Sequence, residues 1–523
     1  MASDKMVKGA LLLTLAGLIS KVLSAGYRIP LQNLTGDVGF YVYQQVYPIL
    51  GIALVLGLYG FPSAISKITV DLKGNGNNLS FRNFYLPVLL ILIGINLALF
   101  LFLRLNADSI AVWVGDRHLT NTYKMAAFVF LLLPFSVLLR GVFQGEFFMV
   151  PTALSQIGEQ LFRVGIIIGA AYLVATQGLN IYEIGKAGGV AGLIGVCGSI
   201  FILFLFFIKY KPVSNDNYPI PWNYYMRTIL TFGVVASMNH MILLLLQFAD
   251  SFTLIPSLVE YGLTSYQAME TKGVYDRGQP LIQLGTVLGS SFALALIPAI
   301  TQRNLKADRD AFYKRVQSSV VFSFYIAAGA TIGLIIIFPE ANVLLFQNDE
   351  GTATLRVLVV AIVLSSISIT ALSILQGLGY IKRTAGFILG ALFIKWIGNQ
   401  LLVPTLGVTG AALATVFSLL ALCTIALFEL KRKHQGLTMF KKVQWKSFLI
   451  AASSMIGFLL LMELITGGRL SFSRVGLLVY IVSIVVIGGG IYISLLIRFG
   501  AFTEKELAML PFASKLTRLQ RRK

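Results

Sequence analysis

The feature that most constrains the fold is a series of about fourteen apolar stretches, most of them about 18 to 25 residues long, separated by short loops. A helix of that length spans the roughly 30 Å hydrocarbon core of a bilayer. Hydrophobic residues make up 57% of the 523-residue chain and charged residues 12%, which would leave a soluble globule with too little polar surface. The sequence therefore predicts an all-α integral membrane protein with about 14 transmembrane helices.

The basic residues are distributed unevenly between alternate loops. The formal net charge of +20 would indicate nucleic-acid binding in a soluble protein. If the N-terminus is cytoplasmic, 28 of the 42 Lys and Arg residues lie in cytoplasmic segments and nine in external loops, whereas the acidic residues are spread almost evenly. This is the positive-inside pattern. It predicts that both termini are cytoplasmic and that the number of spans is even, and we expect no nucleic-acid partner.

The two halves of the chain match each other at one fixed offset. Val42-Tyr43 and Pro48 match Val274-Tyr275 and Pro280, and the same offset pairs Gln144-Gly145 with Gln376-Gly377 and Arg163 with Lys395. Six helices separate the matching spans, so both halves enter the membrane in the same orientation, as a parallel repeat. This predicts a six-helix lobe at 1–210, a second lobe at 211–430 that repeats it, and an extra helix pair with a basic cytoplasmic tail at 431–523.

Charged residues also lie within or at the ends of the predicted spans. The five cations are Lys21, Arg28, Arg140, Arg163 and Lys395, and the three acids are Glu159, Asp250 and Glu463. A charge at the bilayer centre costs on the order of 3 kcal/mol, so these side chains are expected to face protein or a watery cavity unless they reach an interface. The surplus of positive charge favours an anionic substrate, such as a phosphate or pyrophosphate head group, over a cationic drug.

The individual charges allow different interpretations. Arg140 lies close enough to a helix end to reach the interface, which is the preferred interpretation for it. Lys21 and Arg28 share one predicted helix face that carries no acid, which favours a functional role. Glu159 and Arg163 form an i, i+4 pair that either neutralises itself between helices or takes part in function.

Several function classes lack their motifs. The chain contains no G-x-x-x-x-G-K-[ST] loop, so energy for transport would come from an ion gradient, the membrane potential or the substrate's own gradient. It also contains no compact cluster of Asp, Glu, His or Cys that would serve as a catalytic centre or metal site, and its loops are too short to form a catalytic domain. We therefore expect no enzyme activity, no catalytic residues, no bound metal and no cofactor.

The N-terminal motifs resemble those of a known family. The stretch Ser20-Lys21-Val22-Leu23 leads to Arg28 and is followed by Gly36-Asp37-Val38-Gly39-Phe40-Tyr41 and Gly60-Phe61-Pro62. This series is similar to the N-terminal signature of bacterial polysaccharide-biosynthesis membrane proteins. These belong to the multidrug/oligosaccharidyl-lipid/polysaccharide exporter superfamily, which includes the lipid II flippases and the stage V sporulation protein B group. The resemblance extends across the whole chain through helix count, parallel repeat and topology.

The resemblance implies two six-helix lobes that alternate between inward-open and outward-open states. They would move the head group of a lipid-linked oligosaccharide through a cavity while its polyprenyl tail stays among the membrane lipids. In lipid II flippases, cations in spans 1, 2 and 8 are required. Lys21 and Arg28 match those of span 1 and Arg277 matches that of span 8, whereas Gln44 and Gln45 stand at the start of span 2.

Together with the spacing of charges, the resemblance gives a set of expected site residues. Lys21, Arg28, Arg277, Arg163 and Lys395 are the candidates for substrate binding. Because Asp250 lies where some relatives bind Na⁺, Asp250 and Glu159 are the candidates for coupling to Na⁺ or H⁺, with the membrane potential as another driving force.

We therefore predict a flippase for a polyprenyl-pyrophosphate-linked oligosaccharide, a lipid II-type peptidoglycan precursor or another cell-envelope unit, in the bacterial cytoplasmic membrane. The extra helix pair favours this branch over the twelve-span drug antiporters of the same superfamily. An ion-coupled multidrug antiporter and a membrane-embedded glycosyltransferase are the alternatives.

Overall fold

The computed structural model describes residues 2–214, 216–295, 308–434, 436–437, 442–466, 473–503, 507 and 520. These residues are almost entirely helical, and the one extended pairing among them is an isolated bridge between Ser80 and Ser214. Twelve helical stretches in this part of the chain are long and apolar enough to cross a membrane. The all-α membrane fold is confirmed.

The total of 14 spans stays a prediction. The first of the twelve stretches, Leu12–Gly74, is 63 residues long and covers two predicted spans. The predicted span 279–301 extends past the described residues, which stop at 295 in this region.

The chain divides into two compact units. The first comprises Met1–Asp276 with Asn399–Val408, and the second comprises Arg277–Gly398 with Thr409–Lys523. The division into lobes at residues 210 and 430 stays a prediction. Within the predicted basic tail, Lys515, Arg518, Arg521, Arg522 and Lys523 lie outside the described residues.

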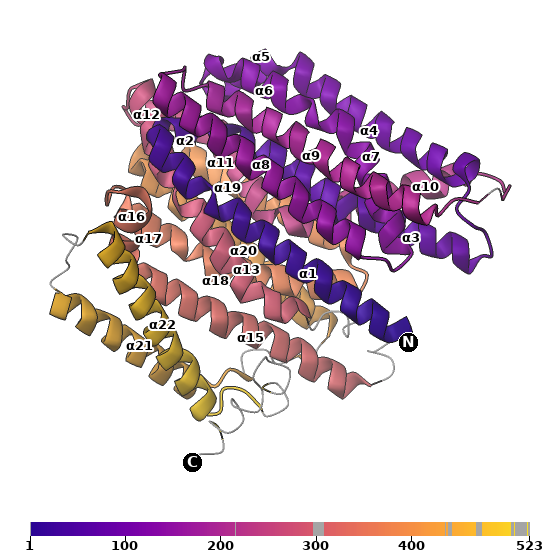
Figure 1. The fold of residues 1–523 in the computed structure, drawn as a ribbon. Helices are drawn as coiled ribbons and strands as arrows, with labels where there is room; N and C mark the ends of the chain where they lie inside the picture. The colour runs from indigo at the N-terminus through magenta and orange to yellow at the C-terminus, as the bar shows by residue number, and fades with distance from the viewer. Residues whose placement is uncertain are drawn as a thin grey trace. The chain divides into compact units, whose positions relative to one another are not determined.

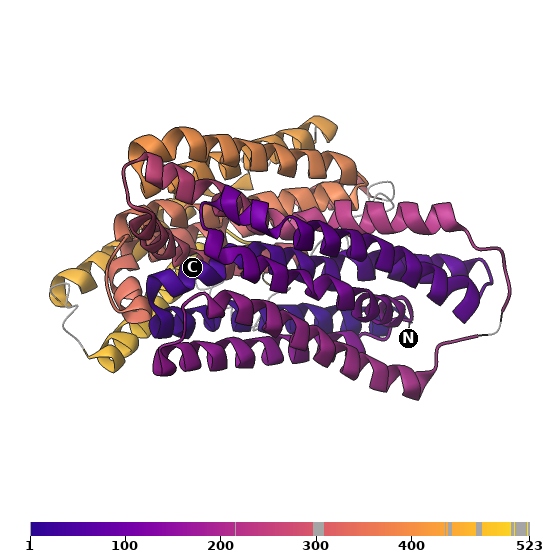
Figure 2. The same cartoon turned by 90° about the horizontal axis from the view of Figure 1, so that it is seen from above.

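The first unit is a bundle of long helices with shorter helices between them (Figure 1). Its α-helices are α1 (Ala2–Gly26), α2 (Arg28–Val55), α3 (Phe61–Gly74), α4 (Leu86–Leu105), α5 (Ala107–Val114), α6 (Thr120–Ala127), α7 (Val129–Gly145), α8 (Val150–Gln177), α9 (Glu183–Tyr210), α10 (Trp222–Thr228), α11 (Ile242–Glu260) and α12 (Ser265–Asp276). Its π-helical segments are η1 (Leu56–Gly60), η2 (Phe81–Tyr85) and η4 (Ile229–Val235), and its 3₁₀ segments are η3 (Arg117–Leu119) and η5 (Ala236–Met241). Figure 2 shows the described residues between α9 and α10, 211–214 and 216–221, as extended segments at one end of this bundle.

The second unit contains the remaining helices. They are α13 (Gly278–Ala295), α15 (Arg309–Ile336), α16 (Phe338–Phe346), α17 (Thr352–Val359), α18 (Ala361–Gly377), α19 (Ile381–Leu406), α20 (Val408–Lys433), α21 (Trp445–Thr466) and α22 (Arg474–Arg498). The end of α19, from Asn399, belongs to the first unit. The helices α21 and α22 lie side by side and pack on α15 (Figure 1), where the Tyr492 hydroxyl donates a hydrogen bond to the Tyr325 carbonyl at 2.7 Å. Within the second unit, the extra helix pair shares a buried apolar core with α15.

The helix boundaries reproduce the repeat seen in the sequence. The helix α6 (Thr120–Ala127) corresponds to α17 (Thr352–Val359), and α7 (Val129–Gly145) corresponds to α18 (Ala361–Gly377). Each start and each end in these two pairs differs by 232 residues. The two halves therefore share a register as well as a motif, which is the signature of a parallel repeat.

The predicted helix face from Lys21 to Arg28 is continuous. Although α1 ends at Gly26 and α2 begins at Arg28, Tyr27 between them has helical φ and ψ, and its amide donates to the Leu23 carbonyl at 3.2 Å. A break lies at Gly36, whose φ of 67° is one that residues with a Cβ rarely adopt. Gly36 therefore separates the end of the first span from the helix of the second.

The segment 254–278 is too polar to be predicted as a span and was therefore expected to be one of the short loops, but it is largely helical. The helix α11 continues to Glu260 and α12 covers Ser265–Asp276. Sequence reasoning missed α12 because its mean polarity is high and its apolar residues do not fill a span.

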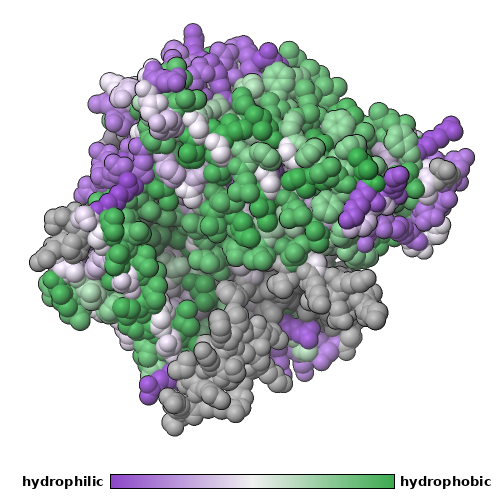
Figure 3. Space-filling model, viewed as in Figure 1, coloured by the Kyte–Doolittle hydropathy of each residue, from purple (hydrophilic) through white to green (hydrophobic). Residues whose placement is uncertain are grey.

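The outer faces of α8 and α9 carry large apolar side chains. Phe162 and Leu173 on α8 and Phe201, Phe204 and Leu205 on α9 are exposed. Figure 3 shows apolar surface over the middle of these helices and hydrophilic surface toward their ends. Such a band is what a hydrocarbon solvent favours, so these faces are suited to lipid.

Candidate functional site

Arg28 is fully buried among tyrosine side chains at the start of α2. Its guanidinium carbon lies 3.9 Å from the centroid of the Tyr47 ring, a cation–π contact. Tyr27 and Tyr43 share a hydrogen bond between their hydroxyls, and their rings meet edge to face with centroids 5.9 Å apart. The aromatic side chains thus hold a desolvated cation in a fixed position.

A second group of buried charges is centred on Glu159 of α8. Its Oε2 accepts a hydrogen bond from Arg140 Nη2 at 2.8 Å, and its Oε1 accepts one from Arg163 Nη2 at 2.9 Å. The three side chains are between 1% and 7% exposed. The predicted pair of Glu159 and Arg163 is confirmed, and one carboxylate faces two guanidinium groups.

Arg140 corrects a prediction. It was expected to reach the membrane interface from its helix end, but its side chain is 1% exposed and lies inside the unit. Besides Glu159, Arg140 donates from Nε to Ser155 Oγ at 3.0 Å and from Nη1 to the Gly57 carbonyl of η1 at 3.2 Å. The reason is that neighbouring helices offer three acceptors, which satisfy the cation better than a distant interface would.

The two cationic groups of the first unit lie near each other. Tyr27 interacts electrostatically with both Arg28 and Arg163. A buried positive region therefore extends from the start of α2 toward α8.

Asp250 of α11 lies in a separate polar group. Asn399 donates a hydrogen bond to Asp250 Oδ1 at 2.8 Å and another to Thr253 Oγ1 at 2.7 Å. The Tyr275 hydroxyl of α12 lies 3.4 Å from Asp250 Oδ2. The carboxylate is buried and hydrogen-bonded, while its role in ion coupling stays a prediction.

The sequence analysis missed a buried ion pair on α12. Lys272 Nζ lies 2.7 Å from Asp276 Oδ2, and the two side chains are 1% and 4% exposed. Lys272 also faces the Tyr41 ring at 5.6 Å from its centroid, and Asp276 interacts electrostatically with Arg28. Lys272 is one of the nine cations that the positive-inside pattern assigns to external loops. Its i, i+4 spacing from Asp276 was the available signal.

Lys21 differs from Arg28 in its surroundings. It is exposed on α1 and forms no ion pair or hydrogen bond with the described part of the chain. One turn earlier, a β-carbon placed on Gly17 would lie 3.2 Å from the Tyr59 hydroxyl, and the Tyr59 ring stacks on His240 with centroids 4.6 Å apart. This face of α1 therefore borders the second and seventh predicted spans.

Arg277 is fully buried in the second unit. Its Nη1 donates to Asn348 Oδ1 at 2.5 Å, its Nη2 lies 3.9 Å from Glu350 Oε2, and its guanidinium carbon lies 5.5 Å from the centroid of the Phe346 ring. Lys21 and Arg28 belong to the first unit, so the expected cluster of Lys21, Arg28 and Arg277 stays a prediction.

Lys395 occupies the repeat position equivalent to Arg163 but has different partners. Its ammonium group donates to the Ala411 carbonyl at 2.9 Å and to Thr415 Oγ1 at 2.8 Å, both on α20. The position equivalent to Glu159 is Ala391, so the second half has no carboxylate at that place. The two repeats therefore bury a cation at the same register with different chemistry.

Comparison with known proteins identifies the family. The family described as "Polysaccharide biosynthesis protein" matches residues 6–304. The "Uncharacterized membrane protein YabM" of Bacillus subtilis (strain 168) is 38% identical over 99% of this chain and 97% of its own length. The chain is a member of the polysaccharide biosynthesis protein family. The predicted membership of the multidrug/oligosaccharidyl-lipid/polysaccharide exporter superfamily is thereby confirmed.

More distant members share the fold of this polysaccharide biosynthesis protein. The "Lipid II flippase MurJ" of Bacillus subtilis (strain 168) is 23% identical over 97% of both chains. A solved "Lipid II flippase MurJ, inward closed conformation" superposes with a TM-score of 0.65 at 13% identity, covering 94% of this chain and 98% of that one. An inward-facing multidrug resistance MATE family transporter gives a TM-score of 0.62 at 14% identity, covering 80% and 96%. The relatives so named are flippases and transporters, not enzymes.

Proposed function

We propose that this protein is a flippase that moves a polyprenyl-pyrophosphate-linked oligosaccharide across the bacterial cytoplasmic membrane by alternating access. The substrate would be a lipid II-type peptidoglycan precursor or another cell-envelope unit. The observation that carries the proposal is the sharing of Glu159 by Arg140 and Arg163, because one carboxylate cannot neutralise two buried guanidinium groups. The positive charge left over favours binding of an anionic head group.

The chemistry of the arginines fits a pyrophosphate. A guanidinium group presents several donors in a planar fork, and its hydrogen bonds to phosphate oxygens are charge-assisted. Arg28, whose position is fixed by Tyr47, would add a further cation on the same side of the first unit. Lys272 contributes less net charge, because Asp276 compensates it within the same helix.

The names of the relatives support the same function. A lipid II flippase matches the full chain in sequence, and a solved flippase of that name matches it in fold. The MATE transporter among the structural relatives keeps ion coupling open as the energy source, for which Asp250 and Glu159 are the candidates. Membrane potential is the other candidate, and both termini are expected to be cytoplasmic.

A flipping assay in proteoliposomes tests the proposal. A fluorescent polyprenyl-pyrophosphate-linked sugar should become accessible to a membrane-impermeant quencher at a rate that depends on the protein. Arg28→Ala and Arg163→Ala should each lower that rate about ten-fold or more, because each removes a charge-assisted contact. Lys186→Ala is the matched control, since Lys186 is a partly exposed surface cation paired with Glu183, and it should flip at the wild-type rate.

The same preparation separates the alternatives. Gradient-driven uptake of a cationic dye without flipping of the lipid-linked sugar would identify a drug antiporter. Transfer of the sugar to an acceptor by the purified chain would identify a glycosyltransferase. Wild-type flipping by both arginine variants would show that these cations serve folding alone.

A further inference from the structure

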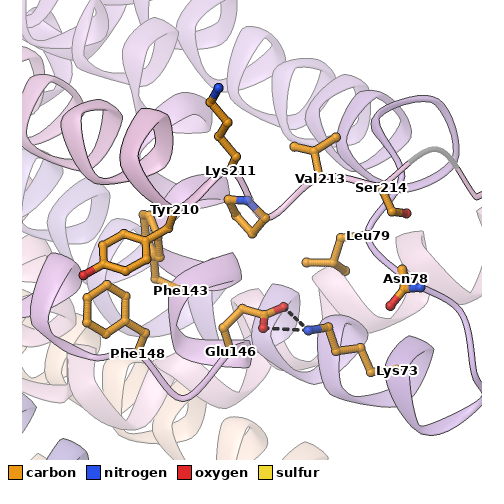
Figure 4. A pocket seen from close by; sticks show the side chains of 11 residues that line it. Lys73, Asn78, Leu79, Phe143, Glu146, Phe148, Tyr210, Lys211, Val213 and Ser214 are labelled. Atoms are coloured by element: carbon orange, nitrogen blue, oxygen red, sulfur yellow. Dashed lines mark hydrogen bonds and ion pairs between the residues drawn. The ribbon is translucent and has the colours of Figure 1, made fainter.

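A polar pocket lies at one end of the first unit. Its volume is about 430 Å³, and it lies where α3, α7 and α9 end (Figure 4). Lys73 and Arg82 at and after the end of α3, and Lys209 and Lys211 at and after the end of α9, belong to the positive-inside pattern, so this end is predicted to be cytoplasmic. Pockets of this size are large enough for a small ligand or a lipid head group.

The lining combines lysines with an aromatic wall. Lys73 bridges to Glu146 at 2.5 Å, and Phe143, Phe148 and Tyr210 form one side (Figure 4). Lys211 lies at the opposite rim, with its ammonium group directed away from the Lys73–Glu146 pair (Figure 4). Two lysines against one carboxylate leave a net positive charge. Aromatic rings beside cations are typical of the membrane–water boundary.

The rim is held in place by hydrogen bonds from the connection between α9 and α10. The backbone amide of Ser214 donates to the Leu79 carbonyl at 2.8 Å. The Tyr85 hydroxyl donates to the Pro212 carbonyl at 2.6 Å. These bonds hold residues 212–214, which line the pocket, against the first unit.

Backbone strain is concentrated around this pocket. In the described part of the chain, three residues other than glycine have a positive φ: Phe147, Lys211 and Gln347. Lys211 lines the pocket, with a φ of 40°, and Phe147 lies between the lining residues Glu146 and Phe148. Side chains with a Cβ rarely adopt this conformation, and strained residues tend to occur where a site requires them. A glycine at 211 would relieve the strain but remove the ammonium group.

We propose that this pocket binds the phosphodiester head group of an anionic phospholipid. The surplus positive charge would attract the phosphate, and the aromatic wall would contact the glycerol and the first carbons of the acyl chains. One turn before Tyr210 on the same face of α9, the half-buried Phe206 ring stacks on the Tyr210 ring with centroids 6.3 Å apart and extends the aromatic wall along the helix toward the acyl chains. A free phosphate would leave the aromatic wall without a partner.

Native mass spectrometry of the full chain in detergent tests this proposal. The probes are short-chain phosphatidylglycerol, phosphatidylcholine with the same chains, and glycerol phosphate. The wild type should bind phosphatidylglycerol more tightly than the other two. Lys211→Gly should weaken phosphatidylglycerol binding about five-fold, which is the usual effect of one lysine near an anionic surface. Lys211→Arg should retain most of the binding.

The controls separate lipid binding from folding and from general surface charge. Lys211→Gly relieves a strained backbone, so its melting temperature should equal or exceed that of the wild type. Lys209→Ser removes an exposed cation two residues away that does not line the pocket, and it should keep wild-type binding. Equal binding of both phospholipids, or an equal loss in Lys209→Ser and Lys211→Gly, would overturn the proposal. Equally tight binding of glycerol phosphate would assign the pocket to a soluble phosphate instead.

Discussion

Glu159 illustrates how this protein keeps several charges at membrane depth. Its two carboxylate oxygens each serve one guanidinium group, and Arg140 also reaches a serine hydroxyl and a backbone carbonyl. The group is therefore hydrogen-bonded on most sides while it retains a positive charge. Removing the shared acid would leave two cations buried together, which is more costly than losing one exposed pair.

We expect Glu159→Gln to lower the free energy of unfolding by about 3–5 kcal/mol, the usual cost of breaking a buried pair. Thermal unfolding in detergent, followed by intrinsic fluorescence, measures the change. Glu183→Gln, which disrupts the partly exposed pair with Lys186, is the matched control and should cost less than about 1 kcal/mol. Similar melting temperatures for the two variants would show that Arg140 and Arg163 find other acceptors.

Lys272 offers a second test at the residue scale. Lys272→Ala leaves the Asp276 carboxylate buried without its ammonium partner, so we expect a loss of about 3 kcal/mol. The double variant Lys272→Met with Asp276→Leu should regain much of that loss, because it removes both charges and keeps apolar volume. The comparison uses the same thermal unfolding measurement. If the double variant is less stable than Lys272→Ala, the ion pair itself stabilises the fold, and neutralising the buried charge is not sufficient.

At the scale of elements, two π-helical segments pack against each other. The segment η1 ends at Gly60 and η4 contains Gly233, and a β-carbon on Gly60 would lie 2.2 Å from the Gly233 carbonyl oxygen. A contact that short cannot be accommodated without moving the backbone. The unusual helical geometry and the missing side chains together allow the second and seventh predicted spans to approach closely.

Gly60→Ala should therefore destabilise the first unit by about 2 kcal/mol or more, in the range of other overpacking substitutions. Gly165→Ala is the matched control, because a β-carbon there meets nothing within 4 Å and alanine favours a helix interior. That control should be neutral or stabilising by up to about 1 kcal/mol. If both alanine variants have the same melting temperature, the backbones at Gly60 and Gly233 can move apart enough to accept a methyl group, which would contradict this prediction.

At the scale of the whole molecule, the repeat and the charge distribution predict how the chain crosses the membrane. The helices α6 and α7 recur as α17 and α18 at a constant offset. A parallel repeat predicts that equivalent helices cross the membrane in the same direction, and the positive-inside pattern predicts which of their ends are cytoplasmic.

Cysteine accessibility tests this topology in a variant without Cys197 and Cys423. The Lys433→Cys variant should react with a membrane-impermeant maleimide only after the cells are permeabilised. The Asp349→Cys variant should react in intact cells, because the loop after α16 is predicted to be external. Labelling of the Lys433→Cys protein from outside would mean that the even span count is wrong.

Much of the fold could be predicted from the sequence, because apolar length and charge bias depend on the solvent and not on tertiary contacts. The predicted spans and their orientation rest on these two features. The repeat and the family resemblance rest on residue matches that can likewise be read from the sequence alone. The pair Glu159 and Arg163 was predictable for a different reason, because helix geometry alone places residues four apart beside each other.

Only the tertiary structure decided which charges are buried and what satisfies them. The position of Arg140 near a helix end suggested the interface, but its acceptors on η1 and α8 come from elsewhere in the chain. Lys272 lay in a segment without an apolar span, yet packing of α12 on α2 buries it. Burial of a polar group depends on whether distant helices supply hydrogen-bond partners, and a single sequence does not contain that pairing.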